Sequence, residues 1–148
     1  MKLEKAIIQK LEKDLETVKT MDDLLGKNGV IKKLVKHLTE RLLQEELTHH
    51  LGYERYQKRE HHGSNSRNGS STKHLKGEFG SIAIDVPRDR EGEFEPLLIA
   101  RHQREFGDLE GKILSLYARG MSVRDIREHL QDLYGLELST AFISRLTD

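Results

Sequence analysis

This chain has no cysteine, which excludes disulfide bonds and thiolate metal sites. No apolar run approaches the roughly 18 residues of a membrane-spanning helix. The first residues, MKLEKAIIQKLEKDLE, are too charged for a secretory signal peptide. We therefore expect a soluble, cytoplasmic protein.

Catalytic motifs are also missing. There is no glycine-rich phosphate loop ending in Lys-Ser or Lys-Thr, and no Ser/His/Asp arrangement in a recognisable context. The acidic residues are expected on solvated helix faces and in the charged turn at 88–96. Two histidine pairs occur, at 49–50 and 61–62, but adjacent residues on a helix point in different directions. No cysteine completes a zinc set, so we expect no catalytic residue, metal or other cofactor in this chain.

The net charge is zero, but the charges are unevenly distributed. Residues 1–52 contain 10 Lys/Arg and 9 Asp/Glu, residues 53–76 contain 6 and 2, and residues 77–148 contain 9 and 14. Such a local basic excess is a better indicator of nucleic-acid contact than the overall balance. The zero total argues against a protein that coats DNA without discrimination.

Apolar spacing predicts several helices. Positions three and four residues apart predict an amphipathic helix over 3–18, whose narrow stripe suits pairing with a partner. A stronger helix is predicted over 29–51, and Gly52 is a natural helix stop. The last third predicts three more helices, the second capped by Ser122 and ended by Gly135, and the third capped by Ser139.

Between the helical regions lies a polar stretch followed by a predicted hairpin. Residues 57–72 contain no hydrophobic side chain, so we interpret them as a loop. Residues 73–79 and 81–86 are predicted strands, since the second alternates apolar and polar positions. Pro87 is expected to end the second strand because it cannot donate a ladder hydrogen bond.

Two regions are candidates for DNA binding. The helices at 108–148 fit a helix-turn-helix, whose third helix would enter a major groove, but a plain three-helix bundle fits equally well. Residues 105–148 hold 5 Lys/Arg and 8 Asp/Glu, so phosphate contacts would need a basic neighbour. The polar stretch is one such neighbour, although a solvated linker has a similar composition. The candidate contacts are Arg59, Asn65, Arg67, Lys73, Lys76, Thr140, Ser144 and Arg145.

These patterns predict a mainly α fold with a small β-hairpin, in three regions. Residues 1–56 form an N-terminal helical region suited to dimerisation or DNA binding. Residues 57–104 form a basic loop and two-stranded hairpin. Residues 105–148 form the tri-helical, helix-turn-helix-like region, and we expect it to be truncated because the chain stops within its last helix.

Five ordered blocks resemble the N-terminal part of mutator-type transposases, the group that includes the insertion-sequence 256 family of bacteria. They are ELTHHLGYER (46–55), GSNSRNGSSTK (63–73), IDVPRDREGEFEP (84–96), ILSLYARGMSVRDI (113–126) and LYGLELSTAFISRLTD (133–148). The resemblance implies a bacterial enzyme that cuts element ends and joins them to target DNA. In the family, three carboxylates of a later RNase H-like domain hold two Mg²⁺ or Mn²⁺ ions.

No position here matches those three carboxylates, so the resemblance implies a fragment without the catalytic domain, inactive alone. We expect it to bind double-stranded DNA at the terminal inverted repeats of an insertion element and to associate with the nucleoid when bound. The expected protein partners are further copies of this chain or a full-length transposase. The alternative is a non-catalytic oligomerisation module that co-assembles with, or inhibits, the full-length enzyme.

Overall fold

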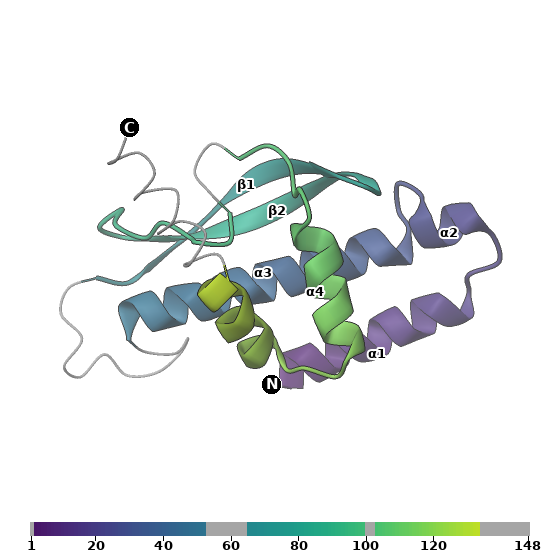
Figure 1. The fold of residues 1–148 in the computed structure, drawn as a ribbon, viewed down its shortest axis with the longest axis horizontal. Coiled ribbons are helices and arrows are strands. Elements are labelled where there is room, and N and C mark those ends of the chain that lie inside the picture. Colours follow the sequence, from purple (N-terminus) through teal and green to yellow (C-terminus); the bar gives the residue numbers. More distant parts are fainter. Residues whose placement is uncertain (1, 53–64, 100–102, 134–148) are drawn as a thin grey trace.

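The computed structural model describes residues 2–52, 65–99 and 103–133. The labelled elements follow in the order α1 (Lys2–Glu16), α2 (Met21–Leu25), α3 (Val30–Leu51), β1 (Arg67–Gly77), β2 (Gly80–Asp89) and α4 (Leu109–Ala118). A further helical segment covers residues 123–133 (Figure 1). The prediction of a mainly helical protein with one two-stranded hairpin is confirmed.

Helix α1 follows its sequence signal closely, while α2 was not predicted. Helix α1 buries Leu11 but leaves Leu15 49% exposed, so its apolar stripe is only partly covered. The short helix α2 was missed, because five residues give no periodicity. It is fixed by a capping box in which Thr20 Oγ1 accepts from the backbone N–H of Asp23, and Asp23 accepts from the backbone N–H of Thr20.

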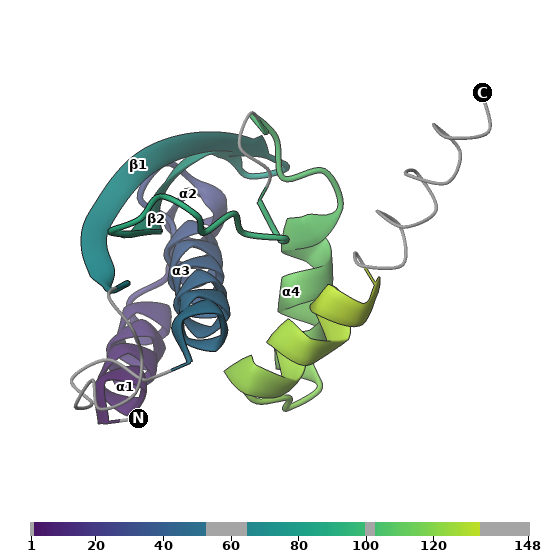
Figure 2. The ribbon, with the colours of Figure 1, turned by 90° about the vertical axis from the view of Figure 1, so that its left-hand side faces the viewer.

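Helix α3 runs along the longest dimension of the molecule (Figure 1). It ends as predicted at Gly52, whose φ of 84° is the left-handed conformation that glycine adopts most easily. Viewed along this helix, the hairpin curves around one side while α4 and residues 123–133 lie on another (Figure 2). Helix α1 runs beside it.

The hairpin is longer than predicted, since β1 begins at Arg67 rather than at residue 73 and β2 extends to Asp89. The loop assigned to 57–72 is therefore wrong for residues 67–72. These residues have no apolar signal because most of β1 faces solvent. What holds them in a strand is pairing to β2, in the register Ser70↔Pro87, Thr72↔Asp85 and Lys76↔Ser81.

Pro87 does not end β2, contrary to the prediction. The backbone N–H of Asp85 points out of the ladder and donates to Glu40 Oε2 at 3.1 Å. Because these directions alternate along a strand, the nitrogen of Pro87 lies on the same outer edge. Proline therefore removes no bond between the two strands, which is the situation in which an edge strand tolerates it.

Helix α3 covers this outer edge of β2. Lys32 Nζ and Lys36 Nζ donate to the carbonyls of Ser81 and Ala83 at 3.4 and 2.7 Å. Glu40, four residues further along the same helix face, accepts from Asp85 as above. Three side chains of α3, spaced four residues apart, thus form hydrogen bonds with backbone groups of every second residue of β2. These bonds close the outer edge of β2 to pairing with another chain.

One apolar cluster joins α3, the hairpin, α4 and the helical segment 123–133. Leu75, Ile82 and Ile84 of the hairpin belong to the same cluster as residues of α3 and of both later helices. The buried members are Val35, Leu38, Leu42, Leu43, Leu75, Ile82, Ile84, Leu98, Ile99, Phe106, Leu109, Ile113, Leu116, Val123, Ile126 and Leu130. All three predicted regions contribute to it, while the proposed division into domains stays a prediction.

The first two helices of the last third lie where expected. Helix α4 ends before Gly120, whose φ is 84°, and Ser122 Oγ caps the segment 123–133 by accepting from the backbone N–H of Asp125 at 3.1 Å. The predicted third helix at 139–148 lies outside the described residues, so the helix-turn-helix stays a prediction. Within the described ranges, no helix is long and apolar enough to cross a membrane.

Candidate nucleic-acid interface

The solvent-facing part of β1 is polar. From Asn68 to Thr72 every residue of the strand is exposed, as are His74 and Lys76. The strand includes Arg67, Lys73 and Lys76 but no carboxylate. One acid faces it from β2: Asp85 Oδ1 accepts from Thr72 Oγ1 at 3.1 Å. This strand is therefore a cationic ribbon with hydroxyl and amide groups between its charges.

The two predicted lysine contacts lie on β1. The side chain of Lys76 is exposed, while its backbone is held by hydrogen bonds to residues 104–106: its N–H donates to Arg104 and its carbonyl accepts from Phe106, both at 2.9 Å. Lys73 is half-buried, and this burial lowers the pKa of its ammonium group. Both cations are thus placed by the sheet rather than by a loop.

The other two described candidates are engaged inside the molecule. Arg67 Nη2 donates to Thr48 Oγ1 of α3 at 2.8 Å. Asn65 Nδ2 donates to Asp89 Oδ2 at 2.9 Å, and Asn65 Oδ1 accepts from the backbone N–H groups of Ser66 and Glu91. These contacts attach the start of β1 to α3 and to the end of β2. A role of either residue in DNA binding stays a prediction.

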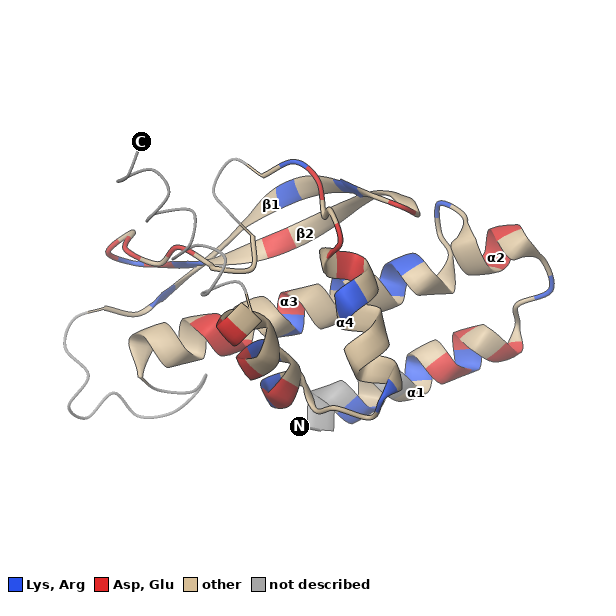
Figure 3. Ribbon diagram, viewed as in Figure 1, with Lys and Arg blue, Asp and Glu red and all other residues tan. Residues whose placement is uncertain are grey.

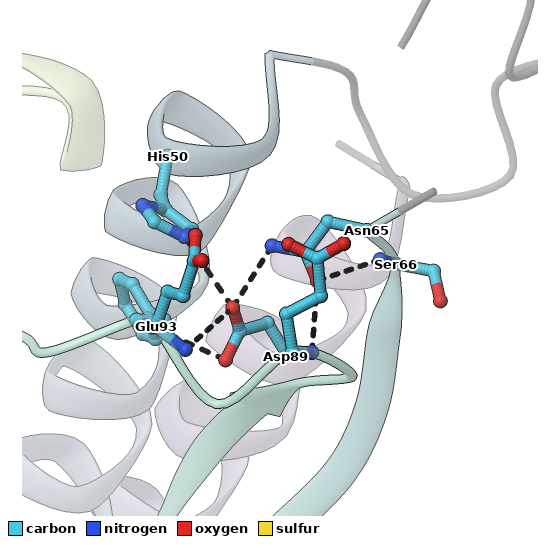
Figure 4. Close-up of polar contacts among 7 residues, drawn as sticks. His50, Asn65, Ser66, Asp89 and Glu93 are labelled. Atoms are coloured by element: carbon cyan, nitrogen blue, oxygen red, sulfur yellow. Dashed lines mark hydrogen bonds and ion pairs between the residues drawn. The ribbon is translucent and has the colours of Figure 1, made fainter. Parts of the chain in front are cut away.

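Asp89 is the centre of that attachment (Figure 4). Only 4% of the residue is exposed, and its carboxylate accepts from the backbone N–H groups of Glu93 and Phe94, both at 3.1 Å. His50 Nε2 lies 3.4 Å from Asp89 Oδ2. Burial raises the pKa of Asp89, but the hydrogen bonds from Asn65, Phe94 and Glu93 outweigh it and lower the pKa to about 2.

Two further carboxylates are buried, so the expectation that acidic residues are solvated is wrong for Glu46, Asp89 and Glu110. Glu46 accepts from the backbone N–H groups of Leu97 and Leu98 at 3.1 and 3.3 Å, and its burial raises its pKa to about 7. Glu110 accepts from the backbone N–H of Glu78 at the hairpin turn. Helix periodicity could not show the roles of Glu46 and Glu110, because their backbone donors lie 32 to 52 residues away in the sequence. Asp89 accepts from the turn that follows its own strand, where the charged sequence gives no sign of burial.

Arg59, Thr140, Ser144 and Arg145 lie outside the described residues, so their predicted contacts stay predictions. Among the residues that are described, no group of three or more His, Asp or Glu side chains is placed to hold a metal ion. The basic ribbon of β1 is therefore the candidate site that the structure does describe.

The fold places this chain among mainly helical proteins built around a polar β-hairpin, and sequence comparison is more specific. The model of the family described as "Transposase, Mutator family" matches residues 6–148. The chain belongs to this family of transposases, as the five ordered blocks indicated.

Several curated relatives are transposases of insertion sequence elements. The chain is 44% identical over 143 residues to the ISRM3 transposase of Rhizobium meliloti, a match covering 97% of this chain and 35% of the relative. A probable ISRM3-like transposase of Sinorhizobium fredii matches with the same identity and coverage. The IS256 transposase of Tn4001 from Staphylococcus aureus is 27% identical over 133 residues, which are 90% of this chain and 34% of that protein. The chain thus spans about a third of the length of these relatives.

Proposed function

We propose that this chain is a DNA-binding part of a Mutator-family transposase that recognises the terminal inverted repeats of its insertion element during transposition. Family membership supports a role at element ends. The structural observation that carries the proposal is strand β1, which is exposed from Asn68 to Thr72 and at Lys76 and contains no carboxylate. A two-stranded β-ribbon is narrow enough to enter the major groove of DNA, and Lys73 and Lys76 would contact phosphates there.

A binding titration tests the proposal. The purified chain is titrated with the element's own ends and with a scrambled duplex of equal length, at several salt concentrations. We expect tighter binding to the ends and a fall in affinity with salt, because phosphate contacts release counterions. Equal affinity for both duplexes at every salt concentration would refute recognition of the ends.

We also propose that this binding needs no metal and that the chain alone neither cleaves nor joins DNA. The Mg²⁺ or Mn²⁺ ions would belong to the three carboxylates of a full-length family member, none of which is matched here. Strand-transfer assays with purified chain, in each metal, should give no product. Joined product from the wild-type chain would overturn this part of the proposal.

A second candidate function is self-association, or co-assembly with a full-length transposase in the cytoplasm. It is favoured by two exposed apolar side chains at the N-terminal end, Leu15 at 49% and Met21 at 67%. Light scattering separates the two functions: a dimer without affinity for element ends supports the oligomerisation module. A monomer that binds the ends supports DNA recognition alone.

A further inference from the structure

Arg88 and Arg90 stand on either side of the buried Asp89, at the open end of the hairpin. We propose that these two arginines, together with Lys73, form a phosphate-binding surface for the DNA backbone. The inference rests on the proposed function and adds two arginines that the sequence patterns had left in a solvated turn.

The backbone at this point is fixed, so the two arginine side chains have defined directions. The N–H of Arg90 donates to the carbonyl of Ser66 at 2.8 Å, which continues the pairing of the strands beyond Asp89. Side chains alternate along a paired strand, and Asp89 is buried while both of its neighbours are exposed. Arg88 and Arg90 therefore project to the side opposite the Asp89 carboxylate.

The three cations meet at one cavity. It has a volume of about 620 Å³ and lies between the hairpin and the turn that follows β2. Arg88, Arg90 and Lys73 all line it, and Asn68, Ser71 and Thr72 of β1 add neutral hydrogen-bonding groups. A phosphate at this cavity would be close to donors from both strands.

Three cationic and three acidic residues border the cavity. Within the described residues, no carboxylate forms an ion pair with Arg88 or Arg90. Of the three acids that border the cavity, Asp89 is occupied by the hydrogen bonds described above, and Glu91 and Glu95 are exposed to solvent. Acidic and basic positions lie side by side at this end of the hairpin and in the following turn (Figure 3). One guanidinium group can donate two parallel hydrogen bonds to two oxygens of the same phosphate. This geometry favours binding of a phosphate over binding of a group with one acceptor oxygen.

The test compares the wild-type chain with an Arg88→Gln/Arg90→Gln variant in salt titrations on element ends and on scrambled DNA. Each lost phosphate contact lowers the slope of log affinity against log salt by about 0.9. We expect the slope to fall by nearly 2 and the affinity to fall at least about tenfold at low salt. Both duplexes should lose affinity alike, because phosphate contacts carry no sequence information.

Two control variants make the result specific. Lys10→Gln/Lys13→Gln removes the same charge from exposed positions on α1 and should leave the slope unchanged. Arg88→Lys/Arg90→Lys retains the charge and should retain most of the slope. Circular dichroism and thermal melting show whether each variant is folded; for a misfolded glutamine pair, the single variants are measured instead.

The outcomes separate this inference from the proposed function. A wild-type chain that binds neither duplex refutes the proposed function. If the wild-type chain binds DNA and the Arg88→Gln/Arg90→Gln variant has the same affinity and salt slope, the arginine site alone is refuted. An equal loss in the α1 control also refutes the site, because net charge rather than position would then explain the effect.

Discussion

Glu46, Asp89 and Glu110 are buried carboxylates, and each accepts hydrogen bonds from the backbone of a turn or loop. A buried charge is costly unless hydrogen bonds replace its water. Asp89 and Glu46 resolve this differently: the pKa of Asp89 falls to about 2 and that of Glu46 rises to about 7. The two residues should therefore respond to pH in opposite directions.

Asp89→Asn should destabilise the fold by about 2 kcal/mol at pH 7. Because its folded pKa of about 2 lies below the ordinary value of 3.8, the carboxylate stabilises the protein above about pH 4. That stabilisation is lost as the pH falls toward 2, so wild type and variant should converge in acid. Urea unfolding at pH 7 and pH 3 measures this, with the exposed Asp132→Asn as the control. Equal stability of wild type and Asp89→Asn at pH 7 would contradict the role of the carboxylate.

Glu46→Gln should show the opposite trend. Burial raises the folded pKa from 4.5 to about 7, so the folded state holds a proton that the unfolded state releases between these values. Wild-type stability from this group is thus full below about pH 4.5 and declines as the pH rises through 7, by up to about 3 kcal/mol.

Thermal melts of wild type and Glu46→Gln at pH 5 and pH 8 test this. The variant should gain melting temperature relative to wild type at the higher pH, because glutamine carries no charge to bury. Glu45→Gln, a change one residue earlier on α3, is the control. A difference between wild type and Glu46→Gln that is constant with pH rules out the titration.

At the scale of elements, the contact between α3 and β2 depends on polar side chains as much as on apolar ones. Lys32, Lys36 and Glu40 bond to the open edge of the strand, where a second chain would otherwise pair. The sequence predicted α3 from its apolar spacing. The sequence could not predict that the lysines and the glutamate of α3 face a strand, since that depends on where the hairpin packs.

Glu40→Ala should expose the Asp85 amide on this edge. That N–H has Glu40 Oε2 as its partner at 3.1 Å, so its hydrogen exchange should accelerate in the variant. The amide of Ile84 points the other way, into the ladder, and should keep its protection. Amide exchange followed by NMR gives both rates in one experiment. An unchanged Asp85 rate would mean that the helix does not cover the edge in solution.

The elements also show which sequence signals were sufficient. Apolar spacing and glycine or serine caps predicted α1, α3, α4 and the segment 123–133, because these signals are local. The first half of β1 carries no such signal, since its side chains face solvent and its order comes from pairing to β2. The short α2 depends on one capping box. Of the candidate site residues, Lys76 is exposed on β1 and Lys73 is half-buried on the same strand, while Asn65 and Arg67 make structural contacts that only the folded chain creates.

At the scale of the whole molecule, one apolar cluster includes residues from α3, both strands, α4 and the segment 123–133. Such a shared core should unfold as a single unit. Leu42→Ala, at a fully buried position of α3, should therefore lower the unfolding free energy by about 3 kcal/mol and shift helix and hairpin signals together.

The measurement is urea unfolding followed by circular dichroism and by NMR signals of the hairpin. Leu15→Ala is the control, since 49% of that side chain is exposed and its loss should change stability much less. Separate transitions for the hairpin and the helices would show that the described elements do not share one cooperative core.

The contacts of Asp89 have a consequence for how the chain can be altered. His50 at the end of α3 and Asn65 before β1 both reach the same carboxylate oxygen, at 3.4 and 2.9 Å. The two ends of the connection between α3 and β1 are therefore anchored at one carboxylate, whatever the length of the connection. Doubling such a connection costs only about 0.6 kcal/mol in closure entropy. Residues 53–64 should therefore accept an inserted peptide tag or reporter domain without disturbing the helices or the hairpin.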